Sequence, residues 1–164
     1  LYPGYPKAET QTVILTECII DTATLLVHYK TSTELVEVLS LYGTNGLTIE
    51  HIHALQNLKD LKEIILFFDG DQAGKEASEK HSKYLKDLFP EVKVSVVPTP
   101  ENEDINSLSV LYGENAAAFI EDLISKRVFF LSQEKVNPET TKRKSKLKYL
   151  LNFIKRFFKN FVSF

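Results

Sequence analysis

Residues 63–77, EIILFFDGDQAGKEA, carry the feature that most constrains the fold of this chain. A run of five apolar residues, IILFF, ends directly before Asp69, and Asp71 follows after one glycine. Continuous apolar runs of this length are typical of a β-strand that helices cover on both faces. A helix-like pattern follows Asp71. We therefore expect a buried parallel strand whose carboxyl end presents two aspartates, at the edge where such sheets bind ligands.

A second strand-like run, VILTE at residues 13–17, ends in another carboxylate, Glu17. If the two strands lie side by side, Glu17, Asp69 and Asp71 converge at one edge of the sheet. Three carboxylates repel each other there unless a cation or a proton lies between them. Oxygen ligands of this kind suit Mg²⁺ or Mn²⁺. The aspartate pair alone would equally suit a solvated turn, and the strand-terminal glutamate favours the metal site.

Strand-like runs alternate with segments of helix length along the chain. This alternation predicts an α/β fold with a four-stranded, mainly parallel sheet flanked by helices. The expected strands are residues 13–17, 36–41, 64–68 and 92–97, and the expected helices are 20–29, 48–58, 72–88, 105–111 and 114–128.

Four segments in this order resemble the Toprim domain of bacterial-type, DnaG-like DNA primases and of primase-like proteins with an N-terminal zinc-binding domain. The segments are VILTECIID, LYGTNGLT, ILFFDGDQAGKEA and EDINSL. The resemblance covers roughly residues 12–112 and implies the Toprim, Rossmann-like fold. One departure is Cys18, because primases usually have glycine after the strand-terminal glutamate and cysteine does not readily adopt positive φ.

By this resemblance, Glu17, Asp69 and Asp71 are the catalytic, metal-binding residues, and Mg²⁺ or Mn²⁺ is the cofactor. The implied reaction is nucleotidyl transfer that joins ribonucleoside triphosphates into RNA primers on a single-stranded DNA template during DNA replication. A replicative helicase and the rest of a longer primase polypeptide are the other implied partners. Two alternatives stay open: a Toprim nuclease that cleaves phosphodiesters, and a non-catalytic Toprim module of a mobile-element replication or recombination protein.

Three charged residues near these motifs have two interpretations each. Asp104 precedes a predicted helix and is either a further metal ligand or a helix N-cap. Asp21 orients Glu17 or a basic group from another part of the protein, or it forms a surface salt bridge. Lys75 pairs with a phosphate or with the acidic cluster, or it is a solvated helix lysine.

The turn that includes Gly43 and Thr44 follows the second predicted strand. Its backbone amides lie at the same sheet edge as the carboxylates, where they could face a phosphate or a metal-bound water. The Asn-Gly pair at residues 45–46 is also an ordinary turn signal that needs no ligand.

Charge is distributed unevenly along the chain, which has 20 Lys and Arg and 22 Asp and Glu. Eight of the basic residues and no acidic residue lie in residues 142–164. The acidic remainder does not have the basic face of a general nucleic-acid binder. Residues 147–164 have the pattern of a basic amphipathic helix, which could bind a partner groove, an anionic membrane surface or nucleic acid, or fold back on the domain itself.

The expected organisation is an extension at 1–11, a Toprim domain at 12–130, a polar linker at 131–146 and the basic helix at 147–164. No apolar run approaches the ~20 residues of a transmembrane helix. The polar N-terminus lacks a secretory signal, and one cysteine fits a reducing compartment, so we expect a cytoplasmic protein. Because the sequence has no methionine, we expect a fragment of a longer polypeptide.

Overall fold

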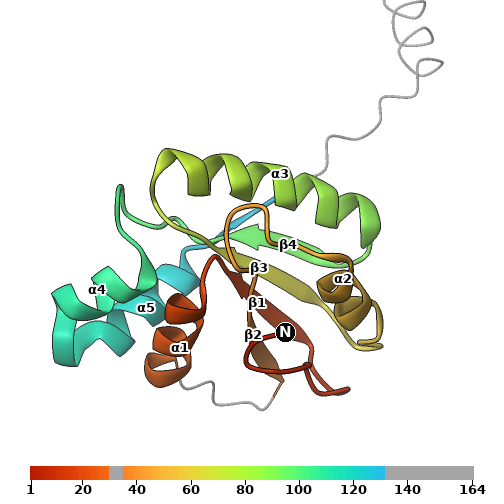
Figure 1. Ribbon diagram of the computed structural model, residues 1–164, viewed down its shortest axis with the longest axis horizontal. Coiled ribbons are helices and arrows are strands. Elements are labelled where there is room, and N and C mark those ends of the chain that lie inside the picture. Colours follow the sequence, from red (N-terminus) through yellow and green to blue (C-terminus); the bar gives the residue numbers. More distant parts are fainter. Residues whose placement is uncertain (30–34, 132–164) are drawn as a thin grey trace, which may run out of the picture. The chain divides into compact units, whose positions relative to one another are not determined.

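Five strands form one sheet in the computed structural model, which describes residues 1–29 and 35–131. Their order is β2-β1-β3-β4-β5, and the first four run parallel (Figure 1). The last strand, β5, pairs antiparallel with β4. The α/β fold with a mainly parallel sheet is therefore confirmed. The strands are β1 (Thr12–Thr16), β2 (Val36–Ser40), β3 (Glu63–Phe67), β4 (Lys93–Val96) and β5 (Val128–Phe129).

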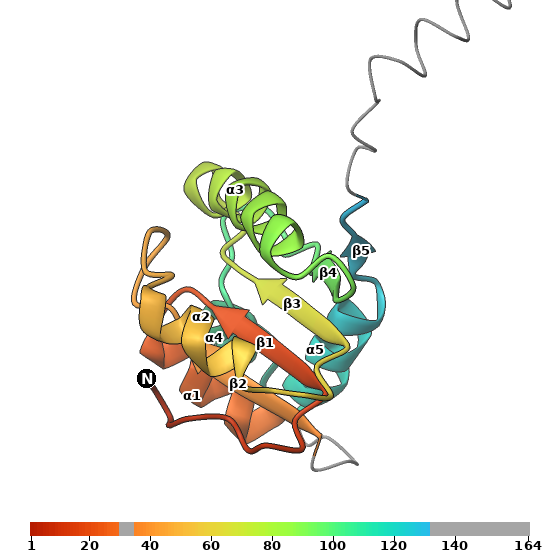
Figure 2. The same cartoon turned by 90° about the vertical axis from the view of Figure 1, so that its right-hand side faces the viewer.

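Helices cover both faces of this sheet (Figure 2). Buried side chains of α2 and α3 pack on one face, and those of α1, α4 and α5 pack on the other. The helices are α1 (Ile19–His28), α2 (Ile49–Gln56), α3 (Gln72–Leu88), α4 (Ile105–Tyr112) and α5 (Ala116–Ser125), with a 3-10 turn, η1 (Gly113–Asn115), before α5.

The apolar run of β3 supplies both layers of the core. Ile64 and Leu66 belong to the cluster under α2 and α3, whereas Ile65 and Phe67 belong to the cluster under α1, α4 and α5. Alternate side chains of a strand point to opposite faces, so a strand covered on both sides must be apolar throughout. This is the physical reason why the run marks the central part of the sheet.

Most predicted elements agree with the structure to within two residues, but the C-terminal end of the sheet differs. The helix expected at 114–128 is shorter, because α5 ends at Ser125 and the chain then forms β5. The sheet therefore has five strands and not four. Two exposed residues, Val128 and Phe129, are too few to give an alternating pattern that a sequence could reveal. The predicted linker and basic helix lie almost wholly outside the described residues.

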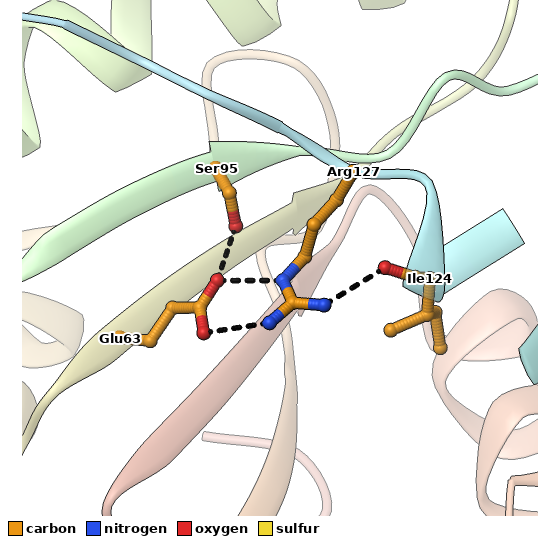
Figure 3. A network of polar contacts seen from close by, with 4 residues as sticks. All are labelled: Glu63, Ser95, Ile124 and Arg127. Atoms are coloured by element: carbon orange, nitrogen blue, oxygen red, sulfur yellow. Dashed lines mark hydrogen bonds and ion pairs between the residues drawn. The ribbon is translucent and has the colours of Figure 1, made fainter.

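A partly buried ion pair connects this last strand to the middle of the sheet (Figure 3). Arg127 precedes β5 and donates two hydrogen bonds to Glu63 of β3, at 2.6 and 3.0 Å. Ser95 of β4 donates to the same carboxylate at 2.7 Å, and Arg127 also donates to the carbonyl of Ile124. The two-point arginine–carboxylate geometry fixes orientation as well as distance. It holds α5 and β5 on the sheet at the end of β3 that lies opposite Asp69.

Replacing Glu63 by glutamine should make the stability of the protein less dependent on pH in the acidic range. Burial raises the pKa of Glu63, but hydrogen bonds from Arg127 and Ser95 outweigh it and hold the pKa below its usual value. The ionised pair therefore contributes fully above the unfolded-state pKa, and the contribution is lost as pH falls through the folded-state pKa. We expect Glu63→Gln to lower the free energy of unfolding by about 1–2 kcal/mol at pH 7, as measured by urea denaturation.

The same comparison at pH 3 should show a much smaller difference. Asp122→Asn is the matched control, because it removes the exposed pair of Asp122 with Lys126, for which about 0.5 kcal/mol or less is expected. Equal losses for both variants at pH 7 would contradict a structural role for the Glu63–Arg127 pair.

Candidate metal centre

Neighbouring strand ends bring Glu17 and Asp69 into direct contact. Strands β1 and β3 pair in parallel, with Thr16 opposite Phe67, so the residues that follow them leave the same edge of the sheet. The Glu17 Oε1 atom accepts a hydrogen bond from the backbone N–H of Asp69 at 3.2 Å. Glu17 is 7% exposed. The structure thus joins two of the three predicted ligands through an element pairing that the sequence only implied.

Gly74 allows the first turn of α3 to approach this contact closely. A Cβ atom on Gly74 would lie 2.2 Å from the carbonyl oxygen of Asp69 and 2.8 Å from Glu17 Oε1. Both distances are too short for non-bonded atoms, so any larger residue must displace one of these groups. Packing against the candidate ligands is therefore the reason why position 74 is occupied by glycine.

Asp71 begins helix α3 and has a structural role of its own. Its Oδ1 atom accepts a hydrogen bond from the backbone N–H of Gly74 at 2.7 Å, which is the N-cap interaction of α3. No hydrogen bond of the described residues uses the second carboxylate oxygen of Asp71. As placed, no three His, Cys, Asp or Glu side chains among the described residues form a set that could hold a metal ion.

The carboxylates of Glu17, Asp21, Asp69, Asp71 and Asp104 influence one another's charge and are called the acidic group below. The electrostatics of this group nevertheless fit a cation. Burial raises the pKa of Asp69 to about 7, and the nearby charges of Glu17, Asp21, Asp104 and Asp71 act in the same direction. Burial also raises the pKa of Glu17, against the hydrogen bond from Asp69, and Asp71 and Asp21 add to it. The ion pairs between side chains of the described residues involve none of these carboxylates. Clustered carboxylate oxygens without an internal counter-charge are the donor set that Mg²⁺ and Mn²⁺ prefer.

Cys18 fits its position without strain, although glycine was expected there. Its φ is −130°, an extended conformation that any residue adopts, so positive φ is not required. The residue is the N-cap of α1, and its sulfur accepts from the backbone N–H of Asp21 at 3.4 Å. The thiol in turn donates to Asp21 Oδ2 at 2.9 Å. Asp21 is 3% exposed, so the alternative of a surface salt bridge is wrong.

The turn after β2 contacts Glu17 through its backbone. The N–H of Gly43 donates to the Glu17 carbonyl at 2.6 Å, and the N–H of Gly46 donates to the Gly43 carbonyl. These two amides are therefore not directed at a phosphate or a metal-bound water, and that interpretation of the turn is wrong for them. Gly43 has a φ of +116°, which explains the need for glycine.

His81 and Lys80 hold this turn from the side of α3, and no pattern in the sequence indicated either role. The ring of His81, which is buried, hydrogen-bonds through Nε2 to the carbonyl of Thr44 at 2.7 Å. Lys80 donates to the Asn45 side chain at 2.8 Å. Because helix α3 carries Asp71 at its start, these bonds connect the turn to the helix that forms one wall of the centre.

The remaining two candidates lie on either side of the carboxylates. Asp104 is the N-cap of α4 and accepts from the backbone N–H of Ser107, as its structural interpretation expected. It is also close enough to raise the pKa of Asp21 and Asp69. Lys75 is exposed on the first turn of α3, and the ion pairs of the described residues do not include it.

Comparison with known proteins identifies the fold. Residues 14–109 match a family model described as Toprim-like. The Aquifex aeolicus primase, solved with its zinc-binding and RNA polymerase domains, is 20% identical, with a TM-score of 0.52 over 89% of this chain and 34% of that chain. A chain in a structure of bacteriophage T7 lagging-strand DNA polymerase with primase domains is 22% identical, with a TM-score of 0.54 over 77% of this chain and 65% of that one.

This chain therefore spans about a third of the first of these proteins and less than two thirds of the second. No curated protein matches it significantly. Across residues 1–29 and 35–131, none of the helices combines the length and the apolar character that crossing a membrane requires.

Changing Gly74 to alanine should disrupt the contact between α3 and the strand ends. Alanine is the better helix former by about 1 kcal/mol, but the clash with the Asp69 carbonyl outweighs this preference. We expect a loss of about 1–3 kcal/mol in the free energy of unfolding. Gly4→Ala is the matched control, because no atom lies within 4 Å of its added Cβ; a similar loss there would contradict the packing argument.

Replacing Asp69 by asparagine should stabilise the metal-free protein. Burial and the surrounding carboxylates raise the pKa of Asp69 to about 7, so at pH 8 the folded state holds an unfavourable charge that asparagine removes. We expect a gain of about 1–2 kcal/mol, reduced from the full linkage value because the group is partly solvated, in urea denaturation with EDTA. The exposed Asp60→Asn should change stability by less than about 0.5 kcal/mol; a loss of stability in Asp69→Asn would contradict like-charge repulsion.

Proposed function

The chain belongs to the Toprim-like family, and from this premise we propose that it supplies the metal-binding carboxylates of a DNA primase-type nucleotidyltransferase. The observation that carries the proposal is the contact of Glu17 with Asp69, inside a group of carboxylates that raise one another's pKa. The likeness of the fold to structures that contain primase domains supports the choice of primase chemistry.

Glu17, Asp69 and Asp71 would hold Mg²⁺ or Mn²⁺ through carboxylate oxygens, with Asp104 as a further candidate. When bound, the ion neutralises phosphate oxygens and orients the attacking hydroxyl. Asp71 has a carboxylate oxygen that no hydrogen bond of the described residues uses, and its position at the start of α3 keeps it beside Asp69. The repulsion within the group provides part of the driving force for taking up a cation.

As the alternative to completing the metal site, Glu17 is the candidate general base of the reaction. Burial raises its pKa, and a raised pKa makes a carboxylate a better proton acceptor near neutral pH. In the proposed step the 3′-oxygen of the primer bonds to the α-phosphorus of the incoming ribonucleoside triphosphate. The bond from that phosphorus to the β-phosphate oxygen breaks and pyrophosphate leaves, while the 3′-hydroxyl proton passes to Glu17. The Gly43 N–H fixes the Glu17 backbone.

The proposed partners are a single-stranded DNA template and ribonucleoside triphosphates. A group of uncompensated carboxylates repels phosphates, so basic groups that hold the template must come from outside it. We assign this role to the rest of a longer primase polypeptide, and a replicative helicase is the further proposed partner. A Toprim nuclease would use the same carboxylates on a different substrate.

Metal titration followed by NMR tests the proposed site directly. Mg²⁺ and then Mn²⁺ are added to the isotope-labelled chain, and to the variant with Asp69→Asn and Asp71→Asn. We expect saturable changes in the amide signals of Glu17, Asp69 and Gly74 for the wild type, and none for the variant. The matched control carries Asp60→Asn and Asp87→Asn, two exposed aspartates outside the group, and should bind like the wild type.

Binding that persists in the Asp69/Asp71 variant would contradict the site, as would the absence of saturable changes at millimolar metal. A positive result leads to assays of the full-length protein with Mg²⁺ or Mn²⁺. Primer synthesis that is lost with Asp69→Asn would support the primase function. Cleavage of DNA without primer synthesis would instead identify a nuclease, and unchanged activity of Asp69→Asn would indicate a non-catalytic module.

A further inference from the structure

A cavity of about 450 Å³ lies beside Asp69, on the face of the sheet that α3 covers. Its walls come from the end of β3, from one side of α3 and from the chain that leaves β4 at 96–99, and Phe130 completes them. Figure 1 shows α3 running alongside β4 above this part of the sheet. Pockets for small molecules have volumes of roughly 300–1,000 Å³ and are usually formed before the ligand binds.

Hydrogen bonds between the wall segments fix the shape of this cavity. The hydroxyl of Thr99 donates to the carbonyl of Phe68 at 2.6 Å, which joins the exits of β4 and β3. The N–H of Val97 donates to the carbonyl of Leu66 at 2.9 Å, and the N–H of Phe130 donates to the carbonyl of Val94 at 2.8 Å. The strand side of the cavity is therefore part of the sheet and its immediate extensions.

The cavity combines apolar walls with an unsatisfied polar group. Phe68, Val96, Pro98 and Phe130 supply aliphatic and aromatic surface. From α3 come Ser78 and Ser82, and Ser82 is 0% exposed. Its hydroxyl oxygen has no hydrogen-bond partner among the described residues. Native structures leave few buried polar atoms unpaired, and each such atom calls for a partner.

Charged groups of both signs stand at the helical side of the same cavity. Lys75 and Glu79 are one turn apart on α3, and both side chains are exposed. The hydrogen bonds and ion pairs of the described residues use neither the Lys75 ammonium nor the Glu79 carboxylate. The rim thus offers a donor and an acceptor to a ligand, whereas the walls offer apolar surface.

We propose that this cavity binds the base of a nucleoside. A nucleobase is planar, has apolar faces that suit the Phe68, Val96 and Phe130 walls, and carries donors and acceptors on its edge for Ser82 and Glu79. A wholly apolar ligand would leave the Ser82 hydroxyl unpaired, and it would gain nothing from the charged rim. Asp69 and Lys75 both border the cavity, so a phosphate attached to the nucleoside would leave it toward the carboxylates and Lys75.

The identification of the ligand as a nucleoside rests on the proposed function, whereas the cavity and its unpaired hydroxyl do not. The site is also separate from the metal ligands in its chemistry, because a nucleoside without phosphate needs no cation. A titration of the metal-free chain with adenosine, guanosine, cytidine and uridine therefore tests the cavity alone.

The experiment follows the amide signals of the isotope-labelled full chain in EDTA while each nucleoside is added. We expect at least one nucleoside to cause saturable changes at Ser78, Ser82 and residues 96–99. No saturable change with any of the four would overturn the proposal, and so would changes that exclude these residues.

Three variants then identify the groups that bind. Ser82→Ala should weaken nucleoside binding about five-fold, the loss expected for one hydrogen bond, and should raise the melting temperature of the free chain. Thr10→Val is the matched control, because Thr10 has the other buried hydroxyl without a partner among the described residues and does not line the cavity. It should also raise the melting temperature but leave the nucleoside affinity unchanged. Ser78→Leu should fill the cavity and abolish binding.

Equal nucleoside affinity in the wild type, Ser82→Ala and Ser78→Leu would overturn the assignment to this cavity.

The proposed function and the proposed nucleoside cavity can be refuted separately. Loss of nucleoside binding to Ser78→Leu with Mg²⁺ binding retained supports the cavity as an independent site. Nucleoside binding in a chain that takes up no metal would refute the proposed function and leave the cavity in place, and metal uptake without nucleoside binding would refute the cavity alone.

Discussion

The hydrogen bond from the Asp69 N–H to the Glu17 carboxylate is the contact on which the candidate site depends. It can form only because β1 and β3 are neighbours, pair in parallel and end at matching positions. It also needs Gly74, because any side chain there would displace either the carboxylate or the Asp69 carbonyl. This one contact between two strand ends therefore requires that β1 and β3 are neighbours, that their register matches and that residue 74 is glycine.

Keeping these carboxylates together without a cation is unfavourable, and the rest of the fold supplies the compensation. Burial and neighbouring charges both raise the pKa of Asp69. The ionised form of Asp69 therefore lowers the free energy of unfolding of the protein. The two apolar clusters on the faces of the sheet hold the strands in place regardless of this repulsion. At the other end of β3, Glu63 and Arg127 attach the last strand. A stable frame that holds an unfavourable cluster of charges in place is typical of functional sites.

Much of this arrangement could be predicted from the sequence, because it follows from patterns that are local. Apolar runs identified the four parallel strands, and the positions of Glu17 and Asp69 at their ends predicted the meeting that the hydrogen bond confirms. The short strand β5 could not be predicted, because two residues carry no periodic signal. The part played by His81 was equally hidden. Its bond to the Thr44 carbonyl depends on how α3 lies against the turn, which is a tertiary relation.

The cavity beside Asp69 shows why tertiary contacts are needed to locate a ligand site, whereas helices and strands can be predicted from local patterns. Ser82 looks like an ordinary small residue on the inner face of a helix, and only its missing partner distinguishes it. Asp69 borders the cavity on one side and contacts Glu17 on the other, so one strand end separates a charged region from an apolar one. A ligand with an anionic end and a planar apolar end could use both regions at once. Asp69 belongs to both regions, whereas Ser78 and Ser82 line the cavity alone and are not among the carboxylates, so substitutions at these serines can alter the cavity separately.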